Sequence, residues 1–332
     1  MPKQPVAAVV VTYNRKDLLL QCIEHLRAQV IERAHGTGMP CETSDELAIL
    51  VIDNASTDGT REALADLVEC GAVDYRNTGS NLGGAGGFNY GMRAAVEAGY
   101  EFCWVMDDDC LPSPGALQAL LDADYGLQGE YGYLSSVARW TDGSICKMNV
   151  QRHPLAHNIT DPDIDVQPCT LASFVSLFVP CRIIREVGLP IKDFFIWTDD
   201  WEFTRRVSRR HDCFVVGGSV VTHASANNGA GTIIDDVPER LDRYRMVYRN
   251  DVVLYREEGL VGYGYLLARG LGHVYRVLRH SPDNKLKKIG IIVSSTIDGL
   301  RFHPEIEFPA EEAPVAEMCQ SALSPLTHSE GE

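Results

Sequence analysis

The stretch Trp104-Val105-Met106-Asp107-Asp108-Asp109-Cys110 places three consecutive carboxylates directly behind an apolar run that begins at Phe102. Such a run is typical of a strand that is buried on both faces. Carboxylates at the end of a buried strand are costly unless a cation neutralises them, and divalent cations prefer carboxylate oxygens. We therefore interpret Asp107 to Asp109 as a metal site. A solvated turn is the alternative interpretation.

Two further predicted strands end in polar residues. Val6 to Val11 leads into Thr12-Tyr-Asn-Arg15, and Leu47 to Ile52 leads into Asp53-Asn-Ala-Ser56. The alternation of strands and helical segments predicts an α/β fold with a Rossmann-like, mainly parallel sheet flanked by helices. In such sheets ligands bind at the carboxyl ends of the strands. The three polar clusters are therefore expected to share one site.

The other expected elements follow from periodicity and turn residues. The segment 31–46 contains three Gly or Pro residues and is expected to be a surface loop. Helices are expected at 60–68, 89–98, 182–187 and from 199 to about 210, and strands at 72–75, 171–179, 214–216 and 219–221.

A glycine-rich segment, Asn81-Leu-Gly-Gly-Ala-Gly-Gly-Phe88, precedes the helix expected at 89–98. Its glycine spacing does not fit a dinucleotide fingerprint, which also follows the first strand of a domain. Glycines permit positive φ angles and a close approach of the backbone to a ligand. We therefore predict a ligand-binding loop. A flexible loop without ligand contact is the alternative.

A second acidic cluster, Asp199, Asp200 and Glu202, opens a predicted helix. Acids in a first helical turn interact favourably with the helix dipole, so simple capping is one explanation. The apolar residues from Phe194 to Trp201 provide another, since an apolar setting raises a carboxylate pKa towards values useful for a general base. His223 follows an apolar strand, and its position leaves metal ligation and a structural role equally open.

Composition excludes some classes of function. The net charge of −16 argues against general nucleic-acid binding. Ten scattered cysteines without a metal-type pair are typical of reduced thiols. No apolar stretch reaches the roughly 20 residues that a membrane span requires, and Met1 to Pro5 shows no apolar signal segment. A cytoplasmic protein is expected, and any membrane contact would be peripheral.

The chain changes character beyond residue 240. Basic residues and tyrosines alternate along helical patterns there, and an acidic tail rich in Pro and Glu follows. The basic segment is expected either to dock on anionic lipid at the inner face of the plasma membrane or to pack on the catalytic domain or a dimer partner. The predicted organisation is a catalytic domain at 1–239, divided at about residue 121, a helical extension at 240–303 and a disordered tail at 304–332.

With these residues in view, the chain resembles the inverting, GT-A-fold glycosyltransferases of family 2 from about Val6 to Asn250. The resemblance rests on four segments in order and spacing, Val10–Arg15, Val51–Ser56, Asn81–Phe88 and Met106–Asp109. Within the family it is most similar to bacterial galactofuranosyltransferases. Those enzymes carry a triple-aspartate metal motif, a Trp-Asp-Asp-x-Glu base motif and a downstream metal-binding histidine. This chain departs from the base motif at Thr198, which leaves the acceptor and the donor sugar open.

The resemblance implies a role for each candidate residue. Asp200 would be the catalytic base. A divalent metal, Mn²⁺ or Mg²⁺, would be held by Asp107, Asp109 and His223. The acceptor would contact Asp199, Glu202, Trp197 and Trp201. The nucleotide would contact Thr12, Asn14, Arg15, Asp53, Asn54, Ser56, Asn81, Gly83, Gly84, Asp107 and Asp108. The first part of the catalytic domain, 1–121, would bind the nucleotide sugar, and 122–239 would bind the acceptor.

The implied activity is a metal-dependent, inverting transfer of galactofuranose from UDP-galactofuranose to a glycan or lipid-linked acceptor in cell-surface polysaccharide synthesis. A rhamnosyltransferase using dTDP-rhamnose is the near alternative, because those enzymes share the earlier motifs. A nucleotidyltransferase is disfavoured because Thr12 to Arg15 contains no glycine where those enzymes have a glycine-rich phosphate loop. An inactive binding module is disfavoured by the intact acids of both clusters.

Overall fold

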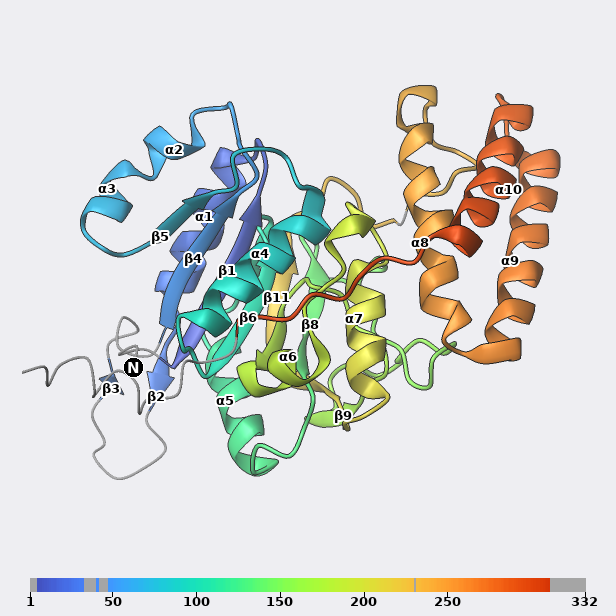
Figure 1. Cartoon of the computed structure of the whole chain (residues 1–332). Coiled ribbons are helices and arrows are strands. Elements are labelled where there is room, and N and C mark those ends of the chain that lie inside the picture. Colours follow the sequence, from blue (N-terminus) through green and yellow to red (C-terminus); the bar gives the residue numbers. More distant parts are fainter. Residues whose placement is uncertain (1–4, 33–39, 42–46, 230, 311–332) are drawn as a thin grey trace, which may run out of the picture.

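The computed structural model describes residues 5–32, 40–41, 47–229 and 231–310. A parallel half-sheet forms one side of the molecule (Figure 1). Its strands run in the spatial order β5 (Asp74–Asn77), β4 (Leu47–Asp53), β1 (Val6–Thr12) and β6 (Phe102–Asp107). Thr12 pairs with Asp53, and Val11 pairs with Asp107. The three predicted polar clusters therefore lie at one edge of the sheet, as the sequence indicated.

The sheet continues beyond β6 with mixed strand directions. β10 (Leu177–Pro180) runs antiparallel to both β6 and β8 (Leu134–Trp140), while β8 is parallel to β11 (Phe214–His223). β7 (Cys110–Pro112) and β9 (Val166–Pro168) pair antiparallel with β11. A separate two-stranded sheet joins β2 (Ile31–Glu32) to β3 (Pro40–Cys41), inside the predicted loop 31–46, and the rest of that loop lies outside the described residues.

Helices cover both faces of the sheet, because side chains of successive strand residues point to opposite faces. Val6, Ala8 and Val10 bury one face against α1 (Lys16–Arg27) and α5 (Ala116–Gly126). Ala7 and Val9 bury the other face against α4 (Gly83–Glu97), α6 (Cys181–Val187) and α7 (Asp199–Ser208). The short helices α2 (Thr60–Ala63) and α3 (Ala65–Glu69) connect β4 to β5.

Several element boundaries differ from the sequence-based expectation. The helix expected at 60–68 is divided at Leu64 into α2 and α3, and the strand expected at 72–75 is β5 at 74–77. Helix α4 begins at Gly83 and not at Asn89. Only 177–180 of the predicted strand 171–179 pairs in the sheet, as β10. The two strands expected at 214–216 and 219–221 are one strand, β11, whose register shifts between Val216 and Val220. Gly217 allows this irregularity, because a Cβ there would lie 2.5 Å from the carbonyl oxygen of Ile164.

The helical extension comprises η3 (Pro238–Arg243), α8 (Tyr244–Arg256), α9 (Gly259–His280) and α10 (Lys285–Arg301). Figure 1 shows α8 between the sheet and the outer pair α9 and α10. No helix among the described residues is long and apolar enough to cross a membrane.

The chain then returns across the catalytic domain as an extended segment, drawn in red in Figure 1. Arg93 donates to the carbonyl oxygen of Phe308 at 2.8 Å, and the Leu189 amide donates to that of Glu307 at 2.8 Å. The first residues of the predicted disordered tail, 304–310, are thus packed against α4 and the end of α6. The remaining part, 311–332, lies outside the described residues.

Candidate active site

The end of β1 binds the second and third aspartates through two side chains. Thr12 Oγ1 donates a hydrogen bond to Asp108 Oδ2 at 2.7 Å. Arg15 Nη1 lies 3.2 Å from Asp108 Oδ1 and 2.7 Å from Asp109 Oδ2. Both aspartates are buried, whereas the Arg15 side chain is half exposed. Asp108 is therefore occupied by protein partners, while Arg15 keeps an open side towards solvent.

Strand β7 brings Asp109 to His223, because Cys110 pairs with His223 in the register of β7 and β11. His223 Nε2 lies 3.2 Å from Asp109 Oδ1. Its other ring nitrogen, Nδ1, is 2.8 Å from Asn149 Oδ1 and 3.5 Å from Cys146 Sγ. Asn149 Oδ1 accepts the Nδ1 proton, so a divalent metal would be met by the Nε2 lone pair. In the structure, burial is outweighed by Asp109, which raises the pKa of His223 to about 10, so Nε2 carries a proton that faces Asp109.

The donor atoms at this place suit a hard or borderline divalent cation. Asp109 Oδ1 is buried and has no hydrogen-bond partner in the described structure. Its neighbour is His223 Nε2 at 3.2 Å, so a cation bound by both atoms would replace this ion pair with two metal bonds. No three His, Cys, Asp or Glu side chains in the described part of the chain form a complete metal site. Mg²⁺ sites commonly use only one or two carboxylates and complete their coordination with substrate phosphates and water, so the Asp109 and His223 pair fits such a cation.

Concentrated negative charge shifts the pKa values of these groups. Burial, together with repulsion from Asp109, raises the pKa of Asp107 to about 7. Burial raises the pKa of Asp108 to about 6, although Thr12 and Arg15 oppose the rise. Burial of Asp109 is outweighed by His223 and Arg15, which lower the pKa of its carboxyl. Arg15 and His223 thus offset only part of the repulsion among the three carboxylates, and a bound cation would offset the rest.

Side chains of the loop after β4 form hydrogen bonds with each other and with the segments that follow β1 and β5. The buried Asp53 carboxylate accepts hydrogen bonds from the Ser56 amide at 2.8 Å and from the Tyr75 hydroxyl at 2.6 Å. The Asn14 amide donates to Ser56 Oγ at 2.8 Å, which joins the loops after β1 and β4. Asn54 is buried and donates to the carbonyl oxygen of Gly83 at 3.0 Å. In the structure Asp53, Asn54 and Ser56 therefore stabilise the loops. That they also contact a nucleotide stays a prediction.

The glycine-rich segment forms the first turns of α4, because its glycines allow close packing. Asn81 Oδ1 accepts a hydrogen bond from the Gly83 amide at 2.8 Å at the start of the helix. A Cβ on Gly87 would lie 2.5 Å from Val11 Cγ1 on β1. Gly83 has a φ of +71°, and a Cβ there would lie 2.0 Å from the carbonyl oxygen of Phe195. The segment thus joins the end of β1 to the chain that precedes the second acidic cluster.

Substitution of Gly83 by alanine is expected to destabilise the protein by about 2–4 kcal/mol, through the positive φ and the collision with Phe195. The neighbouring Gly84→Ala is a matched control, because nothing lies within 4 Å of its Cβ position. It is expected to be neutral or to stabilise by up to about 1 kcal/mol. Urea unfolding of both variants measures the difference, and equal stabilities would contradict the contact with Phe195.

The second acidic cluster begins α7 directly after a strained turn. Three residues of this turn, Phe195, Trp197 and Thr198, have positive φ angles of 65°, 66° and 70°. Such angles are uncommon for aromatic and β-branched residues and persist where surrounding contacts impose them. Asp199 is buried at the helix start, and Asp200 keeps partial exposure. The turn therefore sets the direction in which both carboxylates leave the helix.

Helix α8 supplies the contacts that hold this turn. The fully buried Asn250 donates from Nδ2 to the carbonyl oxygens of Phe194, Ile196 and Trp197, at 3.1, 3.2 and 3.0 Å. Thr198 Oγ1 donates to Asp251 Oδ1 at 3.0 Å, and Arg269 of α9 forms an ion pair with the same carboxylate. No sequence motif pointed to Asn250 or Asp251, because the helix that carries them is separated by about 50 residues from the turn.

Burial and mutual repulsion set the protonation of the two aspartates. Burial raises the pKa of Asp199 to about 6. Burial, repulsion from Asp199 and a further repulsion from Asp107 raise the pKa of Asp200 well above its ordinary value. The repulsion between Asp107 and Asp200 indicates that the two acidic clusters lie within electrostatic reach of each other. A carboxylate in this setting holds a proton more strongly, as a general base requires.

The remaining acceptor candidates have partners of their own. Glu202 is buried, and both of its oxygens are paired with Arg206, at 2.9 and 2.8 Å. Trp201 carries the Arg152 guanidinium over its ring at 4.1 Å. Trp197 packs against Tyr244, with ring centroids 5.4 Å apart. Contact of these residues with an acceptor stays a prediction, and Arg152 is a neighbour of the site that the sequence did not reveal.

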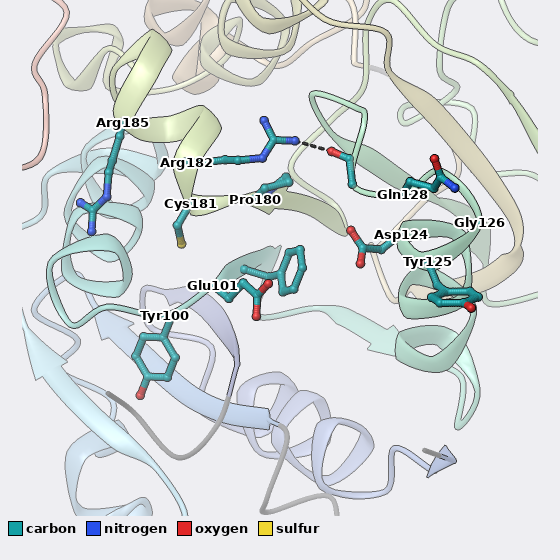
Figure 2. Close-up of a pocket in the computed structure, with 12 residues that line it drawn as sticks. Tyr100, Glu101, Asp124, Tyr125, Gly126, Gln128, Pro180, Cys181, Arg182 and Arg185 are labelled. Atoms are coloured by element: carbon teal, nitrogen blue, oxygen red, sulfur yellow. Dashed lines mark hydrogen bonds between the residues drawn. The ribbon is translucent and has the colours of Figure 1, made fainter. Parts of the chain in front are cut away.

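A cavity of about 940 Å³, whose lining residues are drawn in Figure 2, includes none of these acidic residues in its lining. It is lined by residues at the start of β6, including Tyr100 and Glu101, and by Arg182 and Arg185 of α6. Since Asp107 stands at the opposite end of β6, this cavity is not part of the candidate active site.

Comparison with known proteins places this arrangement in a class. The structure of a mannosyltransferase from Pyrobaculum calidifontis in complex with GDP-Man and Mn²⁺ superposes with a TM-score of 0.55 and 16% identity, over 97% of this chain and 80% of that chain. GalNAc-T7 with UDP, GalNAc and Mn²⁺ gives a TM-score of 0.53 and 13% identity, over 74% and 47% of the two chains. The fold is that of the GT-A glycosyltransferases.

Sequence comparison narrows the class to a family. Residues 7–125 match the model of glycosyl transferase family 2, so the chain contains a family 2 glycosyltransferase domain. The galactofuranosyltransferase GlfT1 of Mycobacterium tuberculosis (strain H37Rv) is 36% identical over 106 residues. That of Mycolicibacterium smegmatis is 32% identical over 108 residues. Each match covers 32% of this chain and 31% of the relative, so the likeness extends over less than a third of the relatives' length.

Proposed function

We propose that the protein is a metal-dependent, inverting glycosyltransferase that takes galactofuranose from UDP-galactofuranose. One observation carries the proposal, namely that the buried Asp109 Oδ1 lies 3.2 Å from His223 Nε2 at the edge where the parallel strands end. This pair, together with the raised pKa of Asp200 on a chain that contains a family 2 domain, supports a site with one bound cation and one general base. The donor sugar is proposed from the likeness to the galactofuranosyltransferases.

The proposed mechanism assigns each side chain one task. Asp200 removes the proton from an acceptor hydroxyl as that oxygen attacks the anomeric carbon on the face opposite the diphosphate. The new glycosidic bond forms as the bond to the diphosphate breaks, so the configuration inverts. Asp109 and His223 would hold a divalent cation, and such a cation would supply positive charge to the departing diphosphate. Arg15, half exposed beside Asp108 and Asp109, is placed to meet a phosphate.

The acceptor and the location belong to the same proposal. We propose a glycan or lipid-linked acceptor beside Asp199, Trp197 and Trp201, in the synthesis of a cell-surface polysaccharide, and a cytoplasmic enzyme working at the inner face of the plasma membrane. A rhamnosyltransferase using dTDP-rhamnose is the second candidate, because Thr198 replaces the tryptophan of the galactofuranosyltransferase base motif.

A panel of nucleotide sugars tests the donor. Purified protein with Mn²⁺ is incubated with UDP-galactofuranose, UDP-galactopyranose, UDP-glucose and dTDP-rhamnose, and the release of each free nucleotide is followed by mass spectrometry. Hydrolysis of UDP-galactofuranose is expected to be fastest by at least about tenfold, which corresponds to about 1.4 kcal/mol of preferential transition-state binding. Preference for dTDP-rhamnose would establish the second candidate, and release of nucleotide from none of them would contradict the proposed activity.

A further inference from the structure

The outer pair of helices exposes apolar side chains on the side opposite its packed face. In α9 only Gly262 and Val277 are buried. Leu260, Leu267, Leu271, Tyr275 and Leu278 of the same helix recur at intervals of three, four or seven residues. These positions form one stripe on a helix, opposite Gly262 and Val277. Leu260 is 91% exposed, and Leu267 and Leu271 are 66% and 62% exposed.

Helix α10 repeats this arrangement. Its buried positions, among them Lys288, Ile292 and Ser295, pack towards the bundle. The opposite side carries Leu286, Val293, Ile297 and Leu300, again at intervals of three, four or seven residues, and Leu286 is 88% exposed. We call these nine apolar residues of the two helices the outer α9–α10 face. So many large, adjacent apolar side chains in water indicate an interaction surface.

Charge indicates what this surface meets. The segment 259–303 contains seven Lys or Arg residues and two Asp residues, whereas the whole chain has a net charge of −16. Arg279 of α9 and Lys285 and Arg301 of α10 are exposed, and the helical period places them beside the two apolar stripes. Apolar stripes flanked by basic residues suit a bilayer surface that contains anionic lipid. The acidic remainder of the chain would be repelled by the same surface, which would fix the orientation of the protein.

We propose that the outer α9–α10 face docks on a bilayer that contains anionic lipids. Dimerisation through this face is less favourable than membrane binding, because two such faces in contact would bring their basic residues close together. The same helices adjoin the acceptor side of the site, since Arg269 of α9 pairs with Asp251, which accepts a hydrogen bond from Thr198 beside Asp199. The docking itself does not depend on the proposed function. Only its purpose does, namely that docking would place the active site near a lipid-linked acceptor.

Vesicle co-sedimentation of the full chain, without donor or acceptor, tests the docking. The chain is expected to sediment with vesicles of phosphatidylcholine containing roughly a third phosphatidylglycerol, to stay in solution with phosphatidylcholine alone, and to be released at about 1 M salt, where the Debye length falls to about 3 Å. Failure to bind the anionic vesicles would overturn the proposal.

Two double variants locate the contact on the outer α9–α10 face. Leu267→Ser with Leu271→Ser is expected to lower partitioning by about tenfold or more, whereas Val68→Ser with Tyr125→Ser, exposed apolar residues elsewhere, leaves it unchanged. Arg279→Gln with Arg301→Gln is expected to lower partitioning about 30-fold, whereas Arg27→Gln with Arg61→Gln, two exposed arginines elsewhere, is expected to leave it unchanged. If the double leucine variant and the double arginine variant of the outer α9–α10 face both bind vesicles as strongly as the wild type, the proposal is overturned.

Analytical ultracentrifugation of the same proteins examines the competing occupant. The wild type and the Leu267→Ser with Leu271→Ser variant are expected to sediment alike as the same species. Self-association of the wild type that this variant abolishes would overturn the proposal and assign the face to a second copy. Because no binding experiment requires turnover, a failure of docking is distinguishable from a failure of the proposed donor hydrolysis.

Discussion

Replacement of Asp200 by asparagine is expected to lower the rate of sugar transfer by about 10²–10⁴-fold, the range that a general base contributes. The substitution keeps the size of the side chain and removes its ability to accept the acceptor's proton. Binding of UDP with Mn²⁺, measured by calorimetry, is expected to remain within about twofold, since Asp200 is not placed at the nucleotide or the metal. Asp66→Asn is a matched control, because Asp66 also stands in the first turn of a helix, α3, and is exposed.

The role of Asp200 as a base also predicts how the transfer rate of the wild type depends on pH. Asp200 must be ionised to act as a base, and burial and Asp199 raise its pKa. The rate is therefore expected to rise with pH through a value above the usual aspartate range. The raised pKa also means that the ionised carboxylate lowers the stability of the folded state at neutral pH. Asp200→Asn is thus expected to unfold at the same or a higher temperature than the wild type, which excludes misfolding as the cause of lost transfer.

Retained turnover in Asp200→Asn would remove Asp200 from the role of base. Loss of activity together with loss of UDP binding would instead show that the residue supports the donor side of the site. Only a large fall in rate with intact donor binding and an intact fold agrees with the proposed mechanism.

Replacement of Asp109 by asparagine, or of His223 by alanine, is expected to weaken Mn²⁺ binding by at least about 100-fold, more than the loss of a supporting residue around a metal typically causes. The first change removes the negative charge of the carboxylate, and the second removes the ring nitrogen that lies 3.2 Å from it. Titration of Mn²⁺ in the presence of UDP, followed by electron paramagnetic resonance, measures the affinity without turnover. Chelation of the metal is expected to abolish donor hydrolysis in the wild type.

His211→Ala provides the matched control for the histidine. His211 lies in the same domain and contacts Glu186 at 3.0 Å, away from the aspartates. Its substitution is expected to leave Mn²⁺ binding unchanged. An unchanged affinity in His223→Ala would assign His223 a structural role, in which Asn149 and Asp109 simply satisfy a buried imidazole.

Much of the donor side of the site could be predicted from local sequence. Three strands are apolar runs that end in a polar residue, at Thr12, Asp53 and Asp107. Burial of both faces of the sheet explains why the runs are apolar. The start of α4 could not be predicted, because the helix propensity of glycine is poor. Packing overrides propensity there, since a Cβ at Gly87 or Gly91 would collide with Val11 or Val9 of β1.

The acceptor side of the site was harder to predict, because contacts between residues far apart in the sequence shape it. Asp199 and Asp200 were visible as acids at a helix start, but nothing nearby in sequence indicated that Asn250 holds the turn before them. Nor did any pattern connect Asn149 with His223, which lie 74 residues apart. Partners of this kind share no period or spacing, so only the folded chain reveals them.

The sequence by itself determined the α/β alternation, the carboxyl-end position of the first acidic cluster and the apolar setting of the second, because each follows from the burial of neighbouring residues. Tertiary structure alone decided that β7 pairs with β11 and so brings His223 to Asp109, and that α8 holds the turn before Asp200. The physical reason is that strand order and helix docking minimise the exposed apolar surface of the whole chain, a quantity that no local segment contains.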